Sequence, residues 1–175
     1  MLGFVPQKGV LFSGTIASNI KFGDENISDE DMYKAAEIAQ ALEFIEGKED
    51  KFDSEISQGG SNVSGGQKQR LSIARALAKK PKILLFDDSF SALDYKTDVK
   101  LRKTLREKMQ DTTTIIVAQR IATILNADKI IVMNEGKVVG IGKHQELLKT
   151  CPTYLEIAES QLSEEELAKG GKHNE

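Results

Sequence analysis

Apolar and polar positions follow two different patterns along this chain, and each pattern predicts a different element. Short continuous apolar runs are typical of strands that are buried in a parallel sheet. Apolar residues that recur every three or four positions predict amphipathic helices. Runs of the first kind lie at residues 2–5, 82–87 and 114–118. Segments of the second kind lie at residues 28–42, 64–80 and 97–109.

Smaller elements fill the remaining sequence. Residues 16–22 are predicted to form a short helix or an irregular turn, and the polar, glycine-containing stretch 48–62 is predicted to be a loop. Two apolar segments, 129–133 and 137–141, flank a turn at residues 134–136 and predict a β-hairpin. Two short helices are predicted to follow, at residues 144–149 and 154–161.

Strands that alternate with helices predict an α/β fold, with a parallel sheet that is covered on both faces. The stretch 14–80 is mostly helical and holds no convincing strand, so we interpret it as a helical subdomain inserted between two core strands. Ligands of such sheets bind at the carboxyl ends of the strands. Polar residues fall at three of these ends, namely Gln7, the pair Asp87 and Asp88, and Gln119.

The composition narrows the possible classes of protein. The chain has 175 residues, 39% hydrophobic and 29% charged, which fits one domain with a modest core. A formal net charge of −3 gives no general attraction to nucleic acid. The single cysteine, Cys151, excludes an internal disulfide and favours a reducing compartment. No apolar run approaches the roughly 20 residues of a membrane span, and no signal peptide is evident.

A glycine-rich helix start lies at residues 64–70. Ser64 and Gln67 have the spacing of a capping box, with the serine at the N-cap and the glutamine three residues later. One interpretation is simply a well-formed helix start. The other is an anion site, because Gly65 and Gly66 would let a phosphate approach the backbone amides at the positive end of the helix dipole.

The string Ser64-Gly65-Gly66-Gln67, followed by QRLSIARAL at residues 69–77, resembles the signature motif of the ATPase domains of ABC transporters. Val63 stands where that family usually has leucine. Further motifs follow with suitable spacing, and segments 10–16 and 127–148 are similar to the exporter branch. The other motifs are the Q-loop at 4–7, Walker B at 83–87, the D-loop at 91–94 and the switch region at 114–124.

This resemblance implies a P-loop NTPase (RecA-like) fold. The core would comprise residues 1–13 and 81–162, and the helical subdomain with the signature motif would comprise residues 14–80. The polar tail at 163–175 is predicted to be disordered. The sequence contains no G-x-x-x-x-G-K-[ST] phosphate loop, so it resembles the C-terminal portion of a nucleotide-binding domain. We therefore expect the isolated chain to bind ATP poorly and to be inactive.

The resemblance implies ATP and Mg²⁺ as cofactors. Asp87 would hold Mg²⁺, usually through water, and Gln7 would reach the same metal and the attacking water. Asp94 would contact a partner domain, and it can also be the N-cap of the helix that follows. The residues implied in nucleotide or metal binding are Gln7, Ser64, Gly65, Gly66, Gln67, Asp87 and Asp94.

Two positions depart from the family pattern at the hydrolytic site. The residue after the Walker B aspartate is usually glutamate, but here Asp88 is shorter by one methylene, about 1.5 Å of reach. A displacement of about 1 Å can cost on the order of 10²-fold in rate. Gln119 replaces the usual histidine and cannot become cationic or relay a proton. These two catalytic candidates together predict a site that binds ATP and hydrolyses it slowly.

The sequence therefore indicates the ATP-binding portion of an ABC exporter at the cytoplasmic face of the membrane. The expected partners are a second nucleotide-binding domain, in a heterodimer whose other site is completed by Ser64 to Gln67, and the transmembrane domains. The substrate would be drug-like or lipid-like, and nucleic acid is not an expected partner. Two alternatives stay open: a truncated, non-catalytic ABC fragment, and a soluble ABC ATPase of DNA maintenance.

Overall fold

The computed structural model describes residues 1–163 and residue 167. The chain forms two compact units, Met1–Val117 and Ala118–Glu175. The predicted disorder of the tail at 163–175 concerns residues that lie almost entirely outside the described part. The predicted boundaries of the helical subdomain, at residues 14 and 80, stay a prediction.

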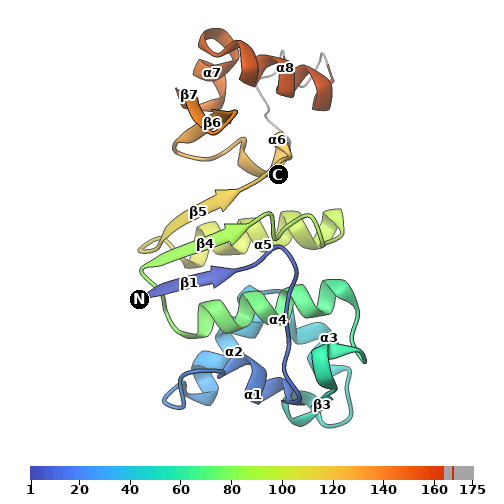
Figure 1. The fold of residues 1–175 in the computed structure, drawn as a ribbon. Coiled ribbons are helices and arrows are strands. Elements are labelled where there is room, and N and C mark those ends of the chain that lie inside the picture. Colours follow the sequence, from blue (N-terminus) through green and yellow to red (C-terminus); the bar gives the residue numbers. More distant parts are fainter. Residues whose placement is uncertain (164–166, 168–175) are drawn as a thin grey trace. The chain divides into compact units, whose positions relative to one another are not determined.

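A parallel sheet of three strands organises the first unit (Figure 1). They are β1 (Leu2–Val5), β4 (Ile83–Asp87) and β5 (Thr113–Val117), in the spatial order β1-β4-β5. The register pairs Val5 with Phe86 and Asp87 with Val117, so the carboxyl ends of the strands meet at one edge. The predicted α/β fold and its parallel sheet are confirmed.

The two faces of this sheet differ in burial. Val5, Leu84 and Phe86 on one face are fully buried, because the helices of the first unit pack there. On the opposite face Leu85 is half-buried, and five apolar side chains are 42–57% exposed, namely Leu2, Phe4, Ile83, Ile115 and Val117. The prediction of a sheet covered on both faces is therefore wrong for the described residues. We call this set of five side chains the open sheet face.

Five α-helices accompany the sheet, and the longest two are α4 and α5. Their bounds are α1 (Ile16–Ile20), α2 (Asp29–Ile38), α3 (Leu42–Glu46), α4 (Gly65–Ala78) and α5 (Tyr95–Lys108). Two 3₁₀ turns occupy Lys51–Asp53 and Gln58–Gly60. The helix predicted at 28–42 ends earlier, at Ile38, and a second helix begins at Leu42, because Gln40 between them adopts a left-handed backbone with φ of 56°. Its side-chain amide donates to the carbonyl oxygen of Glu37 and thereby closes the end of α2.

A short antiparallel ladder joins two segments of the helical region. Strand β2 (Gly14–Thr15) pairs with β3 (Glu55–Ile56). The predictions that residues 48–62 are only loop and that 14–80 lacks a strand are therefore wrong. A ladder of two residues leaves no period-2 pattern in the sequence, and it is held partly by Asn62, whose amide donates to the carbonyl oxygen of Glu55.

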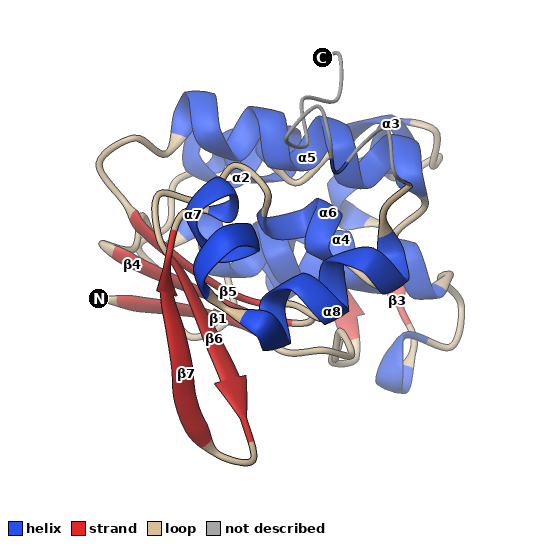
Figure 2. Ribbon diagram, turned by 90° about the horizontal axis from the view of Figure 1, so that it is seen from above, coloured by secondary structure: helices blue, strands red, loops and turns tan. Residues whose placement is uncertain are grey.

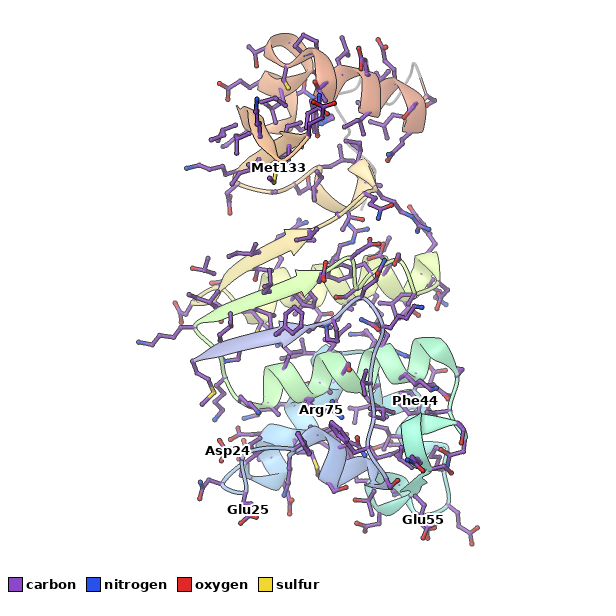
Figure 3. The ribbon with its side chains drawn as sticks, viewed as in Figure 1. Asp24, Glu25, Phe44, Glu55, Arg75 and Met133 are labelled. Atoms are coloured by element: carbon purple, nitrogen blue, oxygen red, sulfur yellow. The ribbon has the colours of Figure 1, made fainter. Side chains whose placement is uncertain are left out.

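Helix α4 lies between β1 and the helices α1 and α2 (Figure 1). Its buried apolar residues belong to the same core as Leu84 and Phe86 of β4. Arg75 of α4 is labelled in Figure 3. It donates to the carbonyl oxygens of Asn19 and Val10, at 2.7 and 2.8 Å, and its guanidinium lies over the Phe12 ring. The helix is therefore attached both to the sheet and to the segment that follows β1.

The described residues of the second unit form a hairpin and the helices α6, α7 and α8 (Figure 2). Its elements are α6 (Ile121–Ile124), β6 (Ile130–Asn134), β7 (Lys137–Gly142), α7 (His144–Thr150) and α8 (Pro152–Gln161). The predicted hairpin is confirmed, and the positive φ angles of Glu135 and Gly136, 48° and 74°, are those of a tight I′-type turn. A buried apolar cluster holds the unit together and includes Ile130, Leu147 and Tyr154.

A buried polar pair completes the second unit. His144, the first residue of α7, places Nδ1 2.8 Å from the hydroxyl oxygen of Tyr154. Burial lowers the pKa of His144 and raises the pKa of Tyr154 to about 12, so both are neutral near pH 7. His144 therefore serves as a structural residue at a helix start, as the sequence predicts.

Candidate functional site

The carboxyl ends of β1 and β4 bring two of the predicted site residues together. Gln7 follows β1 after Pro6, and its Nε2 donates to Oδ2 of Asp88 at 3.1 Å. The two residues are 81 positions apart in the sequence, and only the parallel pairing of β1 with β4 brings them together. The expectation that polar residues meet at this edge of the sheet is confirmed for this pair.

The backbone at Asp88 is held in an unusual conformation. Asp88 has φ of 44°, in the left-handed region that costs energy for a residue with a Cβ atom. Its N–H donates to the carbonyl oxygen of Val117 at 2.9 Å, and its own carbonyl oxygen accepts from the Ser91 hydroxyl at 2.7 Å. The turn after β4 is thus fixed from both sides, and it directs the Asp88 carboxylate toward Gln7.

Ser89 supports the same turn, and sequence analysis did not single it out. Its side chain is fully buried, and its hydroxyl donates to the carbonyl oxygen of Val5 at 2.8 Å. This bond ties the segment after β4 to the last residue of β1, two positions before Gln7. Serine in a turn is common, so the sequence carries no signal for such a long-range bond.

Asp87 is the residue at which the sequence predicts magnesium binding. It is exposed, and it projects from β4 on the same side as Ile83 of the open sheet face. Among the described residues no group of three or more His, Cys, Asp or Glu side chains is arranged to hold a metal ion by itself. Mg²⁺ needs no such cluster, because it is usually held by one or two carboxylates together with phosphate oxygens and water. The oxygen donors of Asp87 and Gln7 therefore fit this ion.

Gln119 belongs to the second unit, two residues after the end of β5. Its carbonyl oxygen accepts from Nε2 of Gln161 at 2.9 Å, and Oε1 of Gln161 accepts from the backbone N–H of Ile121. Helix α8 therefore fixes the backbone around Gln119. The placement of the Gln119 side chain beside Asp88 stays a prediction.

The start of α4 has the geometry that the sequence predicts. Gln67 donates its backbone N–H to the Ser64 hydroxyl at 3.2 Å, and Ser64 donates its N–H to Oε1 of Gln67 at 2.9 Å. The capping box is therefore confirmed. A Cβ atom added to Gly65 would meet nothing within 4 Å, and one added to Gly66 would meet only the Ala92 carbonyl oxygen at 3.8 Å. Open space thus adjoins the positive end of the helix dipole.

Asp94 closes the start of α5. Its Oδ1 accepts from the backbone N–H of Thr97 at 2.9 Å, which confirms the predicted N-cap. The hydrogen bonds from Thr97 lower the pKa of Asp94, and the positive charge of Arg70 on α4 lowers it further. Asp94 is therefore ionised near pH 7 and electrostatically coupled to the helix that begins at Ser64.

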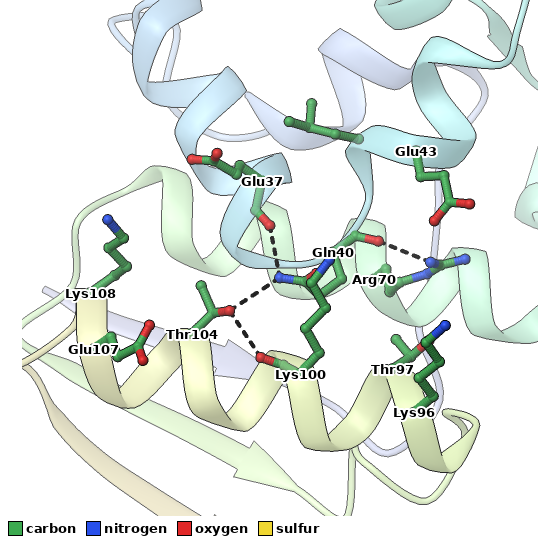
Figure 4. A pocket seen from close by; sticks show the side chains of 11 residues that line it. Glu37, Gln40, Glu43, Arg70, Lys96, Thr97, Lys100, Thr104, Glu107 and Lys108 are labelled. Atoms are coloured by element: carbon green, nitrogen blue, oxygen red, sulfur yellow. Dashed lines mark hydrogen bonds between the residues drawn. The ribbon is translucent and has the colours of Figure 1, made fainter. Parts of the chain in front are cut away.

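A groove of about 520 Å³ lies elsewhere, between the α2–α3 region and α5 (Figure 4). None of the predicted site residues lines it. Lys96, Lys100 and Glu107 contribute from α5, and Gln40 crosses it, donating to the Thr104 hydroxyl at 3.3 Å. Its lysines and glutamates are mixed, so the groove offers no single charge to a ligand.

Comparisons with known proteins place this arrangement in a family. A family model described as ABC transporter matches residues 1–91. A solved bacterial Atm1-family ABC exporter with ATP bound is similar, with a TM-score of 0.88 and 40% identity, over 93% of this chain and 29% of that one. The chain belongs to the ABC transporter family.

Relatives of known name agree with this assignment. An ABC transporter ATP-binding protein of Mycobacterium bovis is 47% identical over 163 residues, which are 91% of this chain and 28% of the relative. A multidrug resistance ABC transporter ATP-binding and permease protein of Lactococcus lactis subsp. cremoris is 39% identical, over 93% of this chain and 28% of the relative. This chain thus spans less than a third of the length of the proteins it matches. Among the described residues no helix is long and apolar enough to cross a bilayer.

Proposed function

We propose that this chain is the C-terminal part of the nucleotide-binding domain of an ABC exporter. It would couple ATP binding and hydrolysis to the movement of a drug-like or lipid-like substrate across a membrane. The observation that carries the proposal is the contact of Gln7 with Asp88 at the ends of two parallel strands, in a unit that also presents a complete signature helix start. The kinds of protein named among its relatives support the transport role.

The open sheet face supports the idea that this chain is one portion of a larger domain. Five apolar side chains, including Phe4 and Val117, lie 42–57% exposed on one side of a parallel sheet. Parallel sheets are normally covered on both faces, so a further part of the domain would pack there. That part would supply the phosphate loop that this sequence does not contain.

At its own site, the chain would contribute oxygen ligands and a hydrolytic carboxylate. Asp87 and the Gln7 side-chain oxygen would hold Mg²⁺, which when bound neutralises charge on the β- and γ-phosphates. Asp88 would orient the attacking water, and its hydrogen bond from Gln7 keeps its carboxylate at this edge of the sheet. Gln119 would donate a hydrogen bond to the γ-phosphate.

Slow hydrolysis at this site follows from two side chains. The Asp88 carboxylate is one methylene shorter than the glutamate usual in this family, and the left-handed turn at φ of 44° fixes its backbone, which limits how far it can move toward the water. Gln119 cannot carry the positive charge that a histidine would bring to the transition state. We infer that ATP stays bound at this site for longer than an intact site needs to hydrolyse its ATP.

The signature helix would act on another ATP, bound to a partner domain. Ser64 and the amides at the start of α4 face open space, where a γ-phosphate of the partner's nucleotide would bind. Because this motif is complete while the chain's own site departs from the pattern, the partner would be a different subunit. The assembled protein would lie at the cytoplasmic face of the membrane.

Nucleotide binding and transport test this proposal together. The assembled transporter would be placed in lipid vesicles, and ATP binding, ATP hydrolysis and substrate movement would be measured for the native protein and for Asp87→Asn. We expect the variant to need more Mg²⁺ for ATP binding at this chain's site and to transport more slowly. A native assembly that binds no nucleotide would instead indicate a non-catalytic fragment.

A further inference from the structure

Gln69 occupies an unusual position for a polar residue. It lies on α4 with 1% of its surface exposed, and its side chain leaves the helix to reach the segment that follows β1. Its Nε2 donates to the carbonyl oxygen of Pro6 at 3.0 Å. Its Oε1 accepts from the backbone N–H of Gly9 at 2.8 Å. These two backbone groups stand on either side of Gln7.

The chemistry of the two partners fixes the orientation of this amide. The Pro6 carbonyl can only accept a hydrogen bond, and the Gly9 N–H can only donate one. A buried side chain that serves both must carry a donor and an acceptor side by side, as a carboxamide does. A carboxylate or an apolar group of the same size would lose one or both bonds. Gln69 therefore acts as a brace across the backbone that carries Gln7.

Close backbone packing holds the same segment against α4. A Cβ atom added to Gly9 would lie 2.8 Å from the Lys68 carbonyl oxygen and 3.0 Å from the backbone nitrogen of Gln69. One residue further, the Val10 carbonyl oxygen accepts from Nη1 of Arg75 at 2.8 Å. The chain after Gln7 thus lies against the helix with no room for a side chain at Gly9, and displacement of α4 would displace Gln7.

We propose that Gln69 is a positioning residue that holds Gln7 at the edge of the chain's own nucleotide site and couples that site to the signature helix. The same helix begins at Ser64, which would bind the partner's ATP, and it reaches Gln7 through Gln69 five residues later. A shift of α4 on binding the partner's nucleotide would therefore change the contact of Gln7 with Asp88, which is 3.1 Å in this structure. This inference rests on the proposed function.

The decisive experiment is a double-mutant cycle on the Mg²⁺ dependence of ATP retention in the assembled transporter. We expect Gln7→Ala to raise the Mg²⁺ concentration for half-maximal ATP retention at this chain's site by about 10-fold, the low end for groups around a bound metal. Gln69→Met should raise it by a similar factor, because Gln7 is then no longer held. The double variant should show no more than the effect of Gln7→Ala alone. Effects that multiply in the double variant would overturn the proposal.

Two further variants separate positioning from folding. Gly9→Ala forces the segment away from α4 while Gln69 stays in place, and it should raise the Mg²⁺ requirement in the same way. Ser72→Ala, a buried change on the same helix with 4% of the residue exposed, should leave the Mg²⁺ requirement unchanged. Thermal unfolding would be measured for each. If Gln69→Met and Gly9→Ala both prevent folding, Gln69 is a structural residue and the proposal is wrong.

The same measurements distinguish the inference from the function on which it rests. If Gln7→Ala leaves the Mg²⁺ requirement unchanged, the proposed role of the strand-end site itself fails. If Gln7→Ala raises the requirement and Gln69→Met does not, the site stands and only the coupling through Gln69 fails.

Discussion

The end of β4 and the start of α4 lie in the same unit, but they offer different chemical groups to a ligand. At the end of β4, Asp87 and Asp88 offer carboxylates, but the second is short and sits in a left-handed turn. At the start of α4, a complete capping box and two glycines leave the helix amides facing open space. The first end departs from the family pattern at Asp88, while the second keeps the capping box and both glycines of the signature motif.

Under the proposed function, the two ends would meet different requirements. A metal-binding carboxylate works at the position of Asp87 whether or not hydrolysis is fast. A helix start that completes another subunit's site must keep its geometry, because that subunit's turnover depends on it. The chain would therefore contribute more to its partner's chemistry than to its own.

Blocking the start of α4 should cause the largest loss of ATP hydrolysis among the variants that compare the two ends. Ser64→Arg removes the hydroxyl and fills the open space beside Gly65 with a long side chain. We expect ATP hydrolysis by the assembled transporter to fall by about 100-fold, comparable to the loss of one preorganised donor at a transition state. Ser64→Thr, which keeps both the hydroxyl and the N-cap, should retain most activity. If Ser64→Arg hydrolyses ATP as fast as the native protein, Ser64 does not complete the partner's site.

Removal of the proposed metal ligand at the end of β4 should have the second-largest effect. Asp87→Asn takes away the negative charge but keeps the shape of the side chain. We expect the Mg²⁺ affinity of this chain's nucleotide site to fall by roughly 10-fold, toward the low end of changes around a bound metal. Steady-state ATPase should fall much less than in Ser64→Arg, because the partner's site is untouched. Titration with Mg²⁺ or Mn²⁺ would measure the shift, with Asp53→Asn, away from this edge in the 3₁₀ turn Lys51–Asp53, as a matched control.

Introducing the glutamate and histidine that are usual in this family should bring the hydrolysis rate of this chain's own site closer to that of the partner's site. Asp88→Glu combined with Gln119→His returns the reach of the carboxylate and the ionisable ring. We expect the turnover of this chain's own site to rise by about 10-fold, less than the full 10² that a 1 Å misplacement can cost, because the backbone turn is unchanged. Single-turnover hydrolysis would measure it. No rise would show that the methylene and the histidine do not limit this site.

The smallest effect is expected for Ser64→Ala, which separates the role of Ser64 as an N-cap from its proposed role in phosphate binding. Ser64→Ala removes the N-cap hydrogen bond to Gln67 without adding bulk. We expect a loss of about 1 kcal/mol in the free energy of unfolding, as for other N-cap serines. Urea unfolding of the native protein and the variant would measure it. A much larger loss would show that the activity of Ser64→Arg cannot be interpreted as a blocked phosphate site.

Much of the fold followed from local patterns. The strand predicted at 82–87, the hairpin turn at Glu135–Gly136 and the N-caps Ser64 and Asp94 are all in the structure, because apolar runs, turn glycines and caps act over a few residues. The β2–β3 ladder was missed because two paired residues leave no period. The open sheet face could not be foreseen, because apolar strands look the same whether or not a layer covers them.

The sequence analysis predicted the residues of the candidate site but not the residues that hold them in place. Gln7 and Asp88 were predicted to lie at one edge of the sheet, and they do. Ser89 and Gln69 hold that edge in place through bonds to residues more than 60 positions away. No local pattern marks such partners, since a buried serine or glutamine is defined by what it meets in the folded chain.

The most direct test of the central claim is to identify the nucleotide at each of the two sites of the assembled transporter. The protein would be incubated with Mg²⁺ and a photoreactive ATP carrying label on the α-phosphate, crosslinked, and the two subunits separated. The account predicts intact ATP on the subunit that carries Asp88 and Gln119, and ADP on its partner. ADP appearing on both subunits at the same rate would contradict it.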